Sequence, residues 1–156
     1  MRYIFYRSIV YIFFLLPYSA VTASNLNPIG VNFIIPAAGN ATRLKLDIPK
    51  ALVEVEGNIT SLQKVVNTCT KLENYNKTIT AVISPIIINN FRKSLPQNIN
   101  LAVQENPLGT AHAVKAALPL INPNFPVTIV LWGDSPLVIK SAIENSVYII
   151  DYSPPI

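Results

Sequence analysis

Beyond residue 30 the chain alternates short, largely apolar runs with longer stretches in which apolar positions recur at helical spacing. Apolar runs bounded by proline, glycine or polar residues predict buried strands. They lie at residues 31–36, 78–84, 99–104 and 127–132. Apolar positions three and four residues apart predict helices in the intervening segments. These lie at residues 60–73, 86–95 and 110–118.

Strands that alternate with helices favour right-handed βαβ units. We therefore expect an α/β fold, a Rossmann-like open, mostly parallel sheet with helices on both faces. Ligands of such sheets bind outside the carboxyl ends of the strands. Gly39 and Asp134 closely follow predicted strands, and Gln104 is the last residue of another. The topology alone therefore brings these three residues to one edge of the sheet.

The loop after the first predicted strand has the composition of a phosphate-binding loop. Ala37, Ala38 and Gly39 carry almost no side chain, so main-chain N–H groups can close on an anion. Arg43 adds a planar fork of donors and Lys50 a point charge, the two usual partners of phosphate oxygens. Ordinary strand-to-helix connections can have the same composition, with solvated cations nearby, and spacing alone leaves both interpretations open.

Three segments, in the same order along the chain, resemble the nucleotidyltransferase superfamily that makes nucleotide sugars. Ala-Ala-Gly-Asn-Ala-Thr-Arg at 37–43, followed by Pro49-Lys50, is similar to its signature loop, with Ala41 where the family has a second glycine. Gln-Glu-Asn-Pro-Leu-Gly-Thr-Ala-His-Ala at 104–113 resembles the base-holding segment of N-acetylglucosamine-1-phosphate uridylyltransferases. Ile-Val-Leu-Trp-Gly-Asp at 129–134 resembles the strand that ends in the metal-binding aspartate.

The resemblance implies a fold of the nucleotide-diphospho-sugar transferase type and transfer of a nucleotidyl group from a nucleoside triphosphate to a sugar-1-phosphate, with release of pyrophosphate. It implies that Arg43 and Lys50 are catalytic, Arg43 at the β and γ phosphates and Lys50 at the α phosphate and the sugar phosphate. It implies that Asp134 holds Mg²⁺, a cation that prefers oxygen ligands. The implied nucleotide-binding residues are Ala37, Ala38, Gly39, Asn40, Ala41, Thr42, Gln104, Gly109, Thr110 and Gly133.

Two of these residues also have a structural interpretation. Asp134 could cap the turn before Pro136, and Thr110 could cap the helix that it begins. His112, one turn into an apolar helix, is predicted to be a packed or half-buried histidine rather than a ligand or catalyst. Within the superfamily, a cytidylyltransferase or a molybdenum-cofactor guanylyltransferase is an alternative, and Pro107 stands where the uridylyltransferases often have a second glutamine.

The carboxyl-terminal part is expected to be incomplete. A helix near residues 139–145 and an apolar piece at 147–150 lead into a proline-containing end. In the resembled family the catalytic domain continues further and supplies most of the acceptor-sugar pocket. We therefore expect a truncated domain at residues 31–156, and a non-catalytic nucleotide-binding remnant is the alternative to an enzyme.

Residues 1–24 are expected to form a signal-like leader or, as an alternative, a spurious extension translated from a misassigned start, with the domain beginning near Asn27. Arg2 and Arg7 precede an apolar run at 9–16, which is shorter than the roughly 20 residues that span a bilayer, and 21–23 resembles a signal-peptidase site. Residues 25–30 are a polar linker. Because the implied substrates are cytoplasmic, we expect a cytoplasmic protein; export or membrane tethering through the leader, with an incidental loop, is the alternative.

Composition narrows the function further. The 156 residues, 51% hydrophobic and 13% charged, suit one domain with a core. Outside the leader the chain has ten basic and eight acidic residues. This small excess of positive charge does not indicate nucleic-acid binding. The single histidine and the single cysteine, Cys69, exclude an internal disulfide and argue against a zinc site or a Ser-His-Asp arrangement; Cys69 is predicted to be a small buried hydrophobe. The P-loop and dinucleotide glycine motifs are absent from the sequence.

Overall fold

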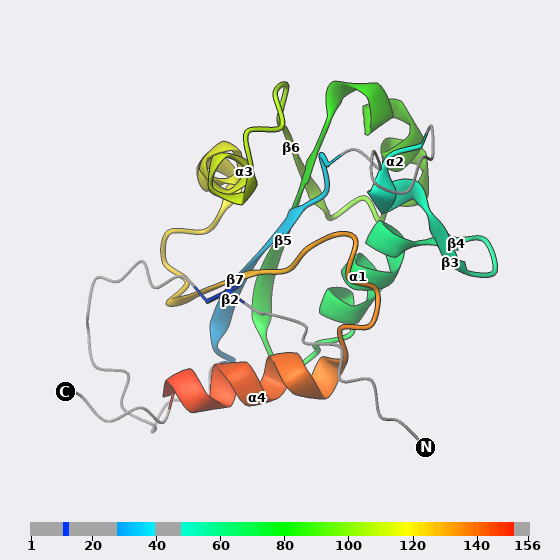
Figure 1. Cartoon of the computed structure of the whole chain (residues 1–156). Helices are drawn as coiled ribbons and strands as arrows, with labels where there is room; N and C mark the ends of the chain where they lie inside the picture. Colours follow the sequence, from blue (N-terminus) through cyan, green and yellow to red (C-terminus); the bar gives the residue numbers. More distant parts are fainter. Residues whose placement is uncertain (1–10, 13–27, 40–47, 152–156) are drawn as a thin grey trace, which may run out of the picture.

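The computed structural model describes residues 11–12, 28–39 and 48–151 (Figure 1). One five-stranded sheet has the order β1-β7-β2-β5-β6. Its strands are β1 (Tyr11–Ile12), β2 (Gly30–Pro36), β5 (Asn76–Ile83), β6 (Asn100–Val103) and β7 (Val127–Val130). β7, β2, β5 and β6 are mutually parallel, whereas the two-residue β1 pairs antiparallel with β7.

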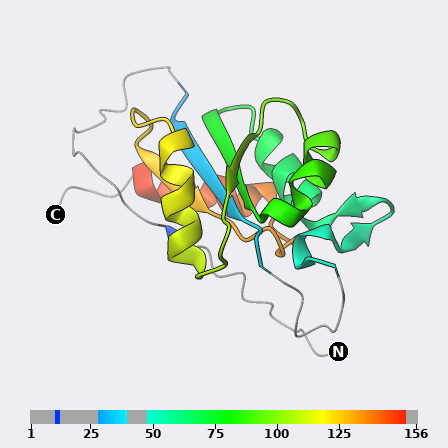
Figure 2. The ribbon, with the colours of Figure 1, turned by 90° about the horizontal axis from the view of Figure 1, so that it is seen from above.

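Four α-helices cover the two faces of this sheet. They are α1 (Ser61–Thr70), α2 (Ile88–Ser94), α3 (Thr110–Ala117) and α4 (Lys140–Asp151). α3 lies on one face, and α1, α2 and α4 lie on the other (Figures 1 and 2). Within the described residues, the connections contain short 3₁₀ helices and a small hairpin: η2 (Lys50–Leu52), η3 (Pro85–Ile87), η4 (Leu118–Leu120), β3 (Glu54–Glu56) and β4 (Ile59–Thr60).

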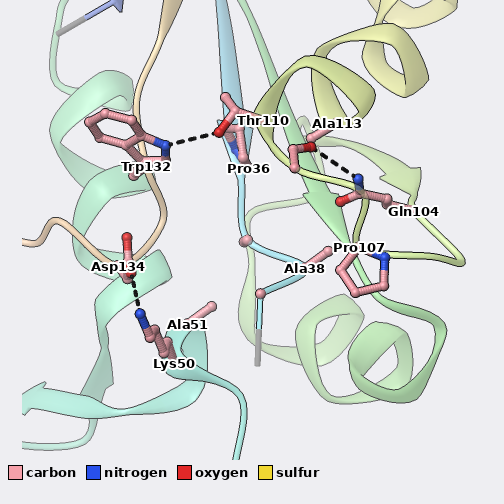
Figure 3. A pocket seen from close by; sticks show the side chains of 13 residues that line it. Pro36, Ala38, Lys50, Ala51, Gln104, Pro107, Thr110, Ala113, Trp132 and Asp134 are labelled. Atoms are coloured by element: carbon pink, nitrogen blue, oxygen red, sulfur yellow. Dashed lines mark hydrogen bonds and ion pairs between the residues drawn. The ribbon is translucent and has the colours of Figure 1, made fainter. Parts of the chain in front are cut away.

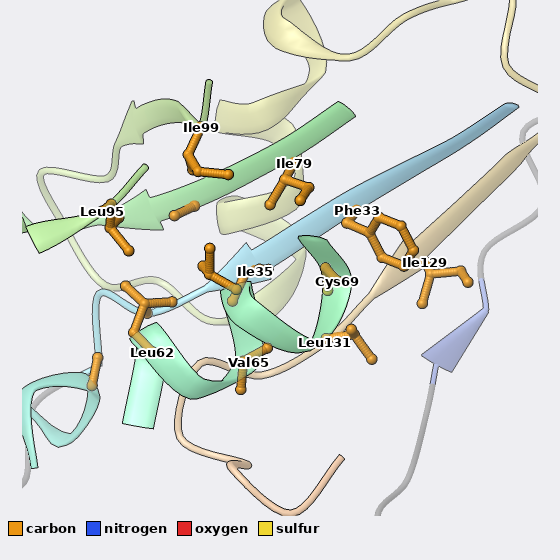
Figure 4. Close-up of a cluster of buried hydrophobic side chains, with 14 of the residues drawn as sticks. Phe33, Ile35, Leu62, Val65, Cys69, Ile79, Leu95, Ile99, Ile129 and Leu131 are labelled. Atoms are coloured by element: carbon orange, nitrogen blue, oxygen red, sulfur yellow. The ribbon is translucent and has the colours of Figure 1, made fainter. Parts of the chain in front are cut away.

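The alternation of side chains along the central strands divides the core into two layers. In β2, Val31, Phe33 and Ile35 are fully buried against the face of α1, α2 and α4 (Figure 4). Ile34, also fully buried, points to the other face, toward Ala113 and Ala117 of α3. Because the period is two, a shift of register by one residue would exchange the two layers. Because both faces of the sheet are covered by apolar layers at β2, hydrophobic residues are favoured at successive positions of this strand.

The order of the strands creates one switch point in the sheet. From β2 the chain moves outward through α1 to β5 and through α2 to β6, and it then returns across the other face through α3 to β7, beside β2. A crevice forms at the carboxyl ends of the strands where the direction of winding reverses, here between β2 and β7. The α/β fold with an open, mostly parallel sheet and helices on both faces is confirmed.

The structure corrects one sequence-based expectation and adds two features to the sequence-based description. α4 is one continuous helix through Asp151, so the helix predicted near residues 139–145 and the apolar piece at 147–150 belong to the same element. Thr110 does not cap α3: it is the first helical residue, and Gly109, with a φ of 94° and no side-chain hydrogen bond, holds the cap position. The β3–β4 hairpin, which turns at Gly57 with a φ of 56°, was not expected.

Most of the predicted leader lies outside the described residues. Of residues 1–24 only Tyr11 and Ile12 are described, and they align with Val130 and Ile129 of β7. Among the residues that the structure describes, none of the helices has the length and apolar content needed to cross a bilayer.

Candidate functional site

A pocket of about 200 Å³ opens at the carboxyl ends of β2, β6 and β7 (Figure 3). It contains residues from all three segments that the sequence singled out. The lining residues are Pro36, Ala37, Ala38, Gly39, Lys50, Ala51, Gln104, Pro107, Gly109, Thr110, Ala113, Trp132 and Asp134. The pocket therefore lies at the edge of the sheet where the topology was expected to bring Gly39, Gln104 and Asp134 together.

The loop after β2 forms one wall of the pocket. Ala37 and Ala38 are buried, and the Ala37 N–H donates to the carbonyl of Val82 at 2.7 Å, which extends the β2–β5 pairing into the loop. Gly39 is exposed, and a Cβ built there would have no atom within 4 Å among the described residues. The small side chains thus leave the main chain open to the pocket. Asn40, Ala41, Thr42 and Arg43, also predicted site residues, lie outside the described residues.

Lys50 and Asp134 lie next to each other on one side of the pocket. Lys50 begins η2, Asp134 follows β7, and Lys50 Nζ lies 3.5 Å from Asp134 Oδ2. Their side chains are 32% and 43% exposed, so solvent weakens the attraction and ligands can reach both groups. The cation predicted to meet phosphate and the carboxylate predicted to hold a metal are therefore neighbours.

Gly133 is not among the pocket-lining residues but fixes the position of its neighbour Asp134. Its N–H donates to the Pro36 carbonyl at 2.9 Å, and its carbonyl accepts from the buried Ser61 Oγ at 2.8 Å. A Cβ at Gly133 would lie 2.9 Å from the Cβ of Ala37. The absence of a side chain therefore lets the end of β7 pack directly against the β2 loop, which brings Asp134 to the pocket.

Gln104 and the start of α3 form the opposite wall. Gln104 is 4% exposed, and its main-chain N–H donates to the Ile83 carbonyl at 2.8 Å, which continues the β5–β6 pairing. Its side-chain Nε2 lies 3.3 Å from the Gly109 carbonyl oxygen and 2.8 Å from His112 Nδ1. His112 is partly buried, as predicted. Gln104, Gly109 and Thr110 are thus held as one hydrogen-bonded unit beside the pocket.

Trp132 lines the pocket although sequence reasoning did not select it. Its indole Nε1 donates to the Thr110 hydroxyl at 3.5 Å, which links the end of β7 to the start of α3 (Figure 3). An aromatic residue directly before Gly133 and Asp134, at the end of a strand expected to reach the site edge, was the available signal. An indole offers a flat apolar face and one donor, both suited to a nucleotide.

The donor set suits a metal bound mainly by its substrate. No group of three or more His, Cys, Asp and Glu side chains that could hold a metal occurs among residues 11–12, 28–39 and 48–151. Asp134 alone offers a partly exposed carboxylate at the pocket. Mg²⁺ commonly takes one or two carboxylates and completes its shell with water and phosphate oxygens. Asp134 therefore fits a divalent cation that enters with a polyphosphate.

Curated relatives confirm the resemblance seen in the sequence. The chain matches no protein-family model. It is 33% identical over 114 residues to the bifunctional protein GlmU of Thermotoga petrophila, which covers 73% of this chain and 24% of that protein. It is 38% identical over 112 residues to GlmU of Shouchella clausii, covering 72% of this chain and again 24% of the relative. The chain thus spans about a quarter of the length of these relatives.

Solved structures agree on the fold. Rv0371c of Mycobacterium tuberculosis superposes with a TM-score of 0.66 at 17% identity, covering 79% of this chain and 61% of that one. The 4-diphosphocytidyl-2C-methyl-D-erythritol synthase of Anaerococcus prevotii gives 0.65 at 15% identity, covering 82% and 53%. HddC of Yersinia pseudotuberculosis, solved with GMP-PN, gives 0.54 at 29% identity, covering 74% and 53%. The nucleotide-diphospho-sugar transferase type of fold is confirmed.

Proposed function

We propose that this chain binds a nucleoside triphosphate and transfers its nucleotidyl group to a sugar-1-phosphate, releasing pyrophosphate. The observation that carries the proposal is the convergence of Lys50, Asp134, Gln104 and the small-residue loop on one pocket. Similarity to GlmU proteins and to HddC, which was solved with GMP-PN, supports nucleotidyl transfer as the reaction class. The sugar-1-phosphate as acceptor rests on the resemblance of the sequence segments.

In this reaction an oxygen of the sugar phosphate attacks the α-phosphorus. Because that oxygen is already anionic, a protein base is unnecessary, and catalysis rests on alignment and on neutralisation of negative charge. Lys50 is proposed to meet the α phosphate and the incoming sugar phosphate, which its place on the pocket wall supports. Arg43, which lies outside the described residues, is proposed to meet the β and γ phosphates.

Asp134 is proposed to hold Mg²⁺. When bound, a divalent cation would neutralise phosphate charge at the pocket. Lys50, 3.5 Å from Asp134, would then turn toward phosphate rather than toward the carboxylate. A related solved structure, Rv0371c of Mycobacterium tuberculosis, is a manganese complex, which supports a divalent cation in this fold. The metal preference can be measured by comparing triphosphate affinities in Mg²⁺ and in Mn²⁺.

A second candidate function is triphosphate binding without turnover. Among the described residues the pocket wall carries a single carboxylate, Asp134, and a single cation, Lys50. These groups suffice to hold a nucleotide with its metal, whereas transfer also requires the acceptor sugar phosphate to be aligned. Binding and turnover are therefore measured separately.

The test combines calorimetry with a pyrophosphate-release assay. Binding of ATP, GTP, CTP and UTP is measured with Mg²⁺, and release is measured with a panel of sugar-1-phosphates. We expect Lys50→Ala and Arg43→Ala to weaken binding of every triphosphate about tenfold, the size of one charge-assisted contact. Lys140→Ala, an exposed cation on α4 paired with Glu144, is the matched control and should bind normally. If the affinity for triphosphates is the same in the unsubstituted chain and in both of these variants, the proposed phosphate-binding roles of Lys50 and Arg43 are wrong.

We propose a cytoplasmic location because the proposed substrates are made and used there. Amino-terminal sequencing of the native protein tests this, since a start near Ser24 would indicate an exported product. The proposed partners are the triphosphate and the sugar phosphate, without nucleic acid, and membrane contact is proposed only for a chain that retains residues 1–24.

A further inference from the structure

The amide of Gln104 is held by two acceptors of the protein itself. A side-chain amide nitrogen has two protons and cannot accept a hydrogen bond. One proton is directed at the Gly109 carbonyl oxygen, 3.3 Å away, and the other at His112 Nδ1, 2.8 Å away. Both donors of Gln104 are therefore used inside the protein, and its carbonyl oxygen Oε1 remains for a ligand.

The Gly109 carbonyl determines which way round the amide lies. A carbonyl oxygen can only accept, so the Gln104 atom that faces it must be the nitrogen and not Oε1. Oε1 is turned toward the middle of the pocket (Figure 3). Within the described residues no donor is bonded to Gln104 Oε1. Among the same residues, Thr80 Oγ1 is the side-chain polar atom that is both fully buried and without a hydrogen bond, so Oε1 is not fully buried. Oε1 is thus an accessible acceptor in a largely buried side chain.

The same contact defines the state of the histidine. Because Gln104 Nε2 always donates, His112 Nδ1 must accept, which requires a neutral imidazole with its proton on Nε2. His112 lies on α3, whose first turn also carries Thr110, bonded to Trp132 of the opposite wall. The orientation of Gln104 is therefore fixed by a helix that is itself anchored across the pocket.

We propose that His112 is a positioning residue for nucleobase selection: its unprotonated Nδ1 holds the Gln104 amide so that the pocket offers the base a fixed acceptor. A fixed acceptor matches a base whose ring nitrogen carries a proton at the pairing edge, as in uracil and guanine. It is mismatched to the ring lone pair of cytosine and adenine. The proposal rests on the proposed function, because it assumes that a nucleotide occupies this pocket.

The tautomer can be measured without any ligand. His112 is the single histidine of the chain, so ¹⁵N-histidine labelling gives one imidazole whose signals need no assignment by mutation. Long-range ¹H–¹⁵N correlation of the full chain should show Nδ1 without a proton and Nε2 with one. In Gln104→Leu the signature of the accepted hydrogen bond at Nδ1 should disappear. A protonated Nδ1 in the unsubstituted chain would overturn the proposal.

The selection is tested by calorimetry with the four triphosphates and Mg²⁺. The unsubstituted chain should bind UTP or GTP at least tenfold tighter than CTP, since an unpaired polar group at a buried edge costs about that much. His112→Leu frees the amide to rotate, so the ratio should fall toward one. His112→Asn keeps an acceptor near the Nδ1 position and should restore most of the ratio. Lys115→Ala, on the exposed side of α3, is the control that should change neither affinity nor ratio.

The outcomes separate the two proposals. A chain that binds none of the triphosphates overturns the proposed function and the selection together. If triphosphates bind but His112→Leu keeps the original ratio, the positioning role is overturned while the proposed function stands. Should His112→Leu fail to fold, the comparison of His112→Asn with the unsubstituted chain decides, because a ratio near one in that variant would equally overturn the role.

Discussion

Asn32, a polar residue in the middle of the apolar strand β2, is buried to 1% exposure because every polar atom has a partner. Its Oδ1 accepts from Thr78 Oγ1 at 2.6 Å and from the Asn122 N–H at 2.9 Å, and its Nδ2 donates to the Asn122 carbonyl at 3.0 Å. One side chain thus joins β2, β5 and the loop before β7. The hydrophobic pattern predicted that Asn32 belongs to a buried strand. It could not predict the hydrogen-bond partners of Asn32, because they lie 46 and 90 residues away in the sequence.

Asn32→Ala should lower the free energy of unfolding by about 2 kcal/mol, because it leaves partly buried main-chain groups of Asn122 and the Thr78 hydroxyl without these partners. Urea denaturation measures the change, with Asn98→Ala, an exposed asparagine, as the control expected to stay within about 0.5 kcal/mol. Equal stabilities of the two variants would show that the network contributes little.

The close packing around Gly133 leads to a second prediction, the effect of Gly133→Ala on stability. In Gly133→Ala the new methyl would meet the Ala37 Cβ at 2.9 Å and the Pro36 carbonyl oxygen at 3.2 Å, so the β2 loop or the end of β7 must shift. We expect a loss of about 1 to 3 kcal/mol, the usual cost of overpacking, together with weaker triphosphate binding. Gly39→Ala, where an added Cβ meets nothing, should leave thermal stability unchanged. A Gly133→Ala chain as stable as that control would rule out the packing role.

Among the elements, α1 shows how local sequence and tertiary contact divide their roles. Thr60 and Ser61 stand next to each other at the start of this helix, and either could cap it by residue type. Threonine and serine are both common helix caps. In the structure Thr60 and Gln63 form a reciprocal capping box, with Thr60 Oγ1 accepting from the Gln63 N–H at 3.3 Å and Gln63 Oε1 accepting from the Thr60 N–H at 2.7 Å. Ser61 instead donates to the Gly133 carbonyl. The choice depends on β7, which no local pattern in residues 60–73 describes.

Thr60→Ala should therefore destabilise the protein by about 1 kcal/mol, as loss of a helix cap does, while Thr60→Ser keeps the hydroxyl and should cost much less. Thermal unfolding followed by circular dichroism provides the measurement. Thr68→Ala, which removes a hydroxyl within the same helix that bonds only to the preceding turn at Lys64, is the matched control. If the Thr60 and Thr68 variants lose the same stability, the capping box is not what stabilises α1.

The β3–β4 hairpin marks the limit of prediction at the level of elements. Its strands have three and two residues, and β3 is exposed throughout. Such short, solvent-facing strands have neither the apolar run nor the alternation on which the longer strands were predicted. Gly57 adopts a positive φ at its turn, a conformation that glycine accepts readily, but one glycine between polar residues is compatible with many loops.

For the whole molecule, the parallel sheet and the edge that carries the pocket followed from the alternation of strands and helices. Gln104 and Asp134 were expected at this edge because each lies at or just beyond the end of a predicted strand, and both line the pocket. The contacts within the pocket were not predictable in the same way. The pairs Lys50–Asp134 and Thr110–Trp132 join residues 84 and 22 positions apart, so they depend on how β2, β7 and α3 pack rather than on any local pattern.

Cys69 reports on the integrity of the whole core. It is fully buried among the side chains between the sheet and α1, and this burial raises the pKa of its thiol from 9.0 to about 12. The predicted role of a small buried hydrophobe is confirmed. Since it is the single cysteine, thiol reagents at neutral pH should label the native chain only as fast as it opens, whereas the denatured chain should react at once.

The same burial predicts how stability depends on pH. Above about pH 9 the unfolded chain loses the Cys69 proton while the folded chain retains it up to about pH 12, so the unfolded state binds fewer protons and is favoured as pH rises. Stability should therefore fall between pH 9 and 12, with a slope from this group of at most about 1.4 kcal/mol per pH unit. Cys69→Ala removes the titrating group, so its urea midpoint, although lower at pH 7, should decline less over this range. Parallel declines in the two chains would mean that the thiol is not shielded by the core.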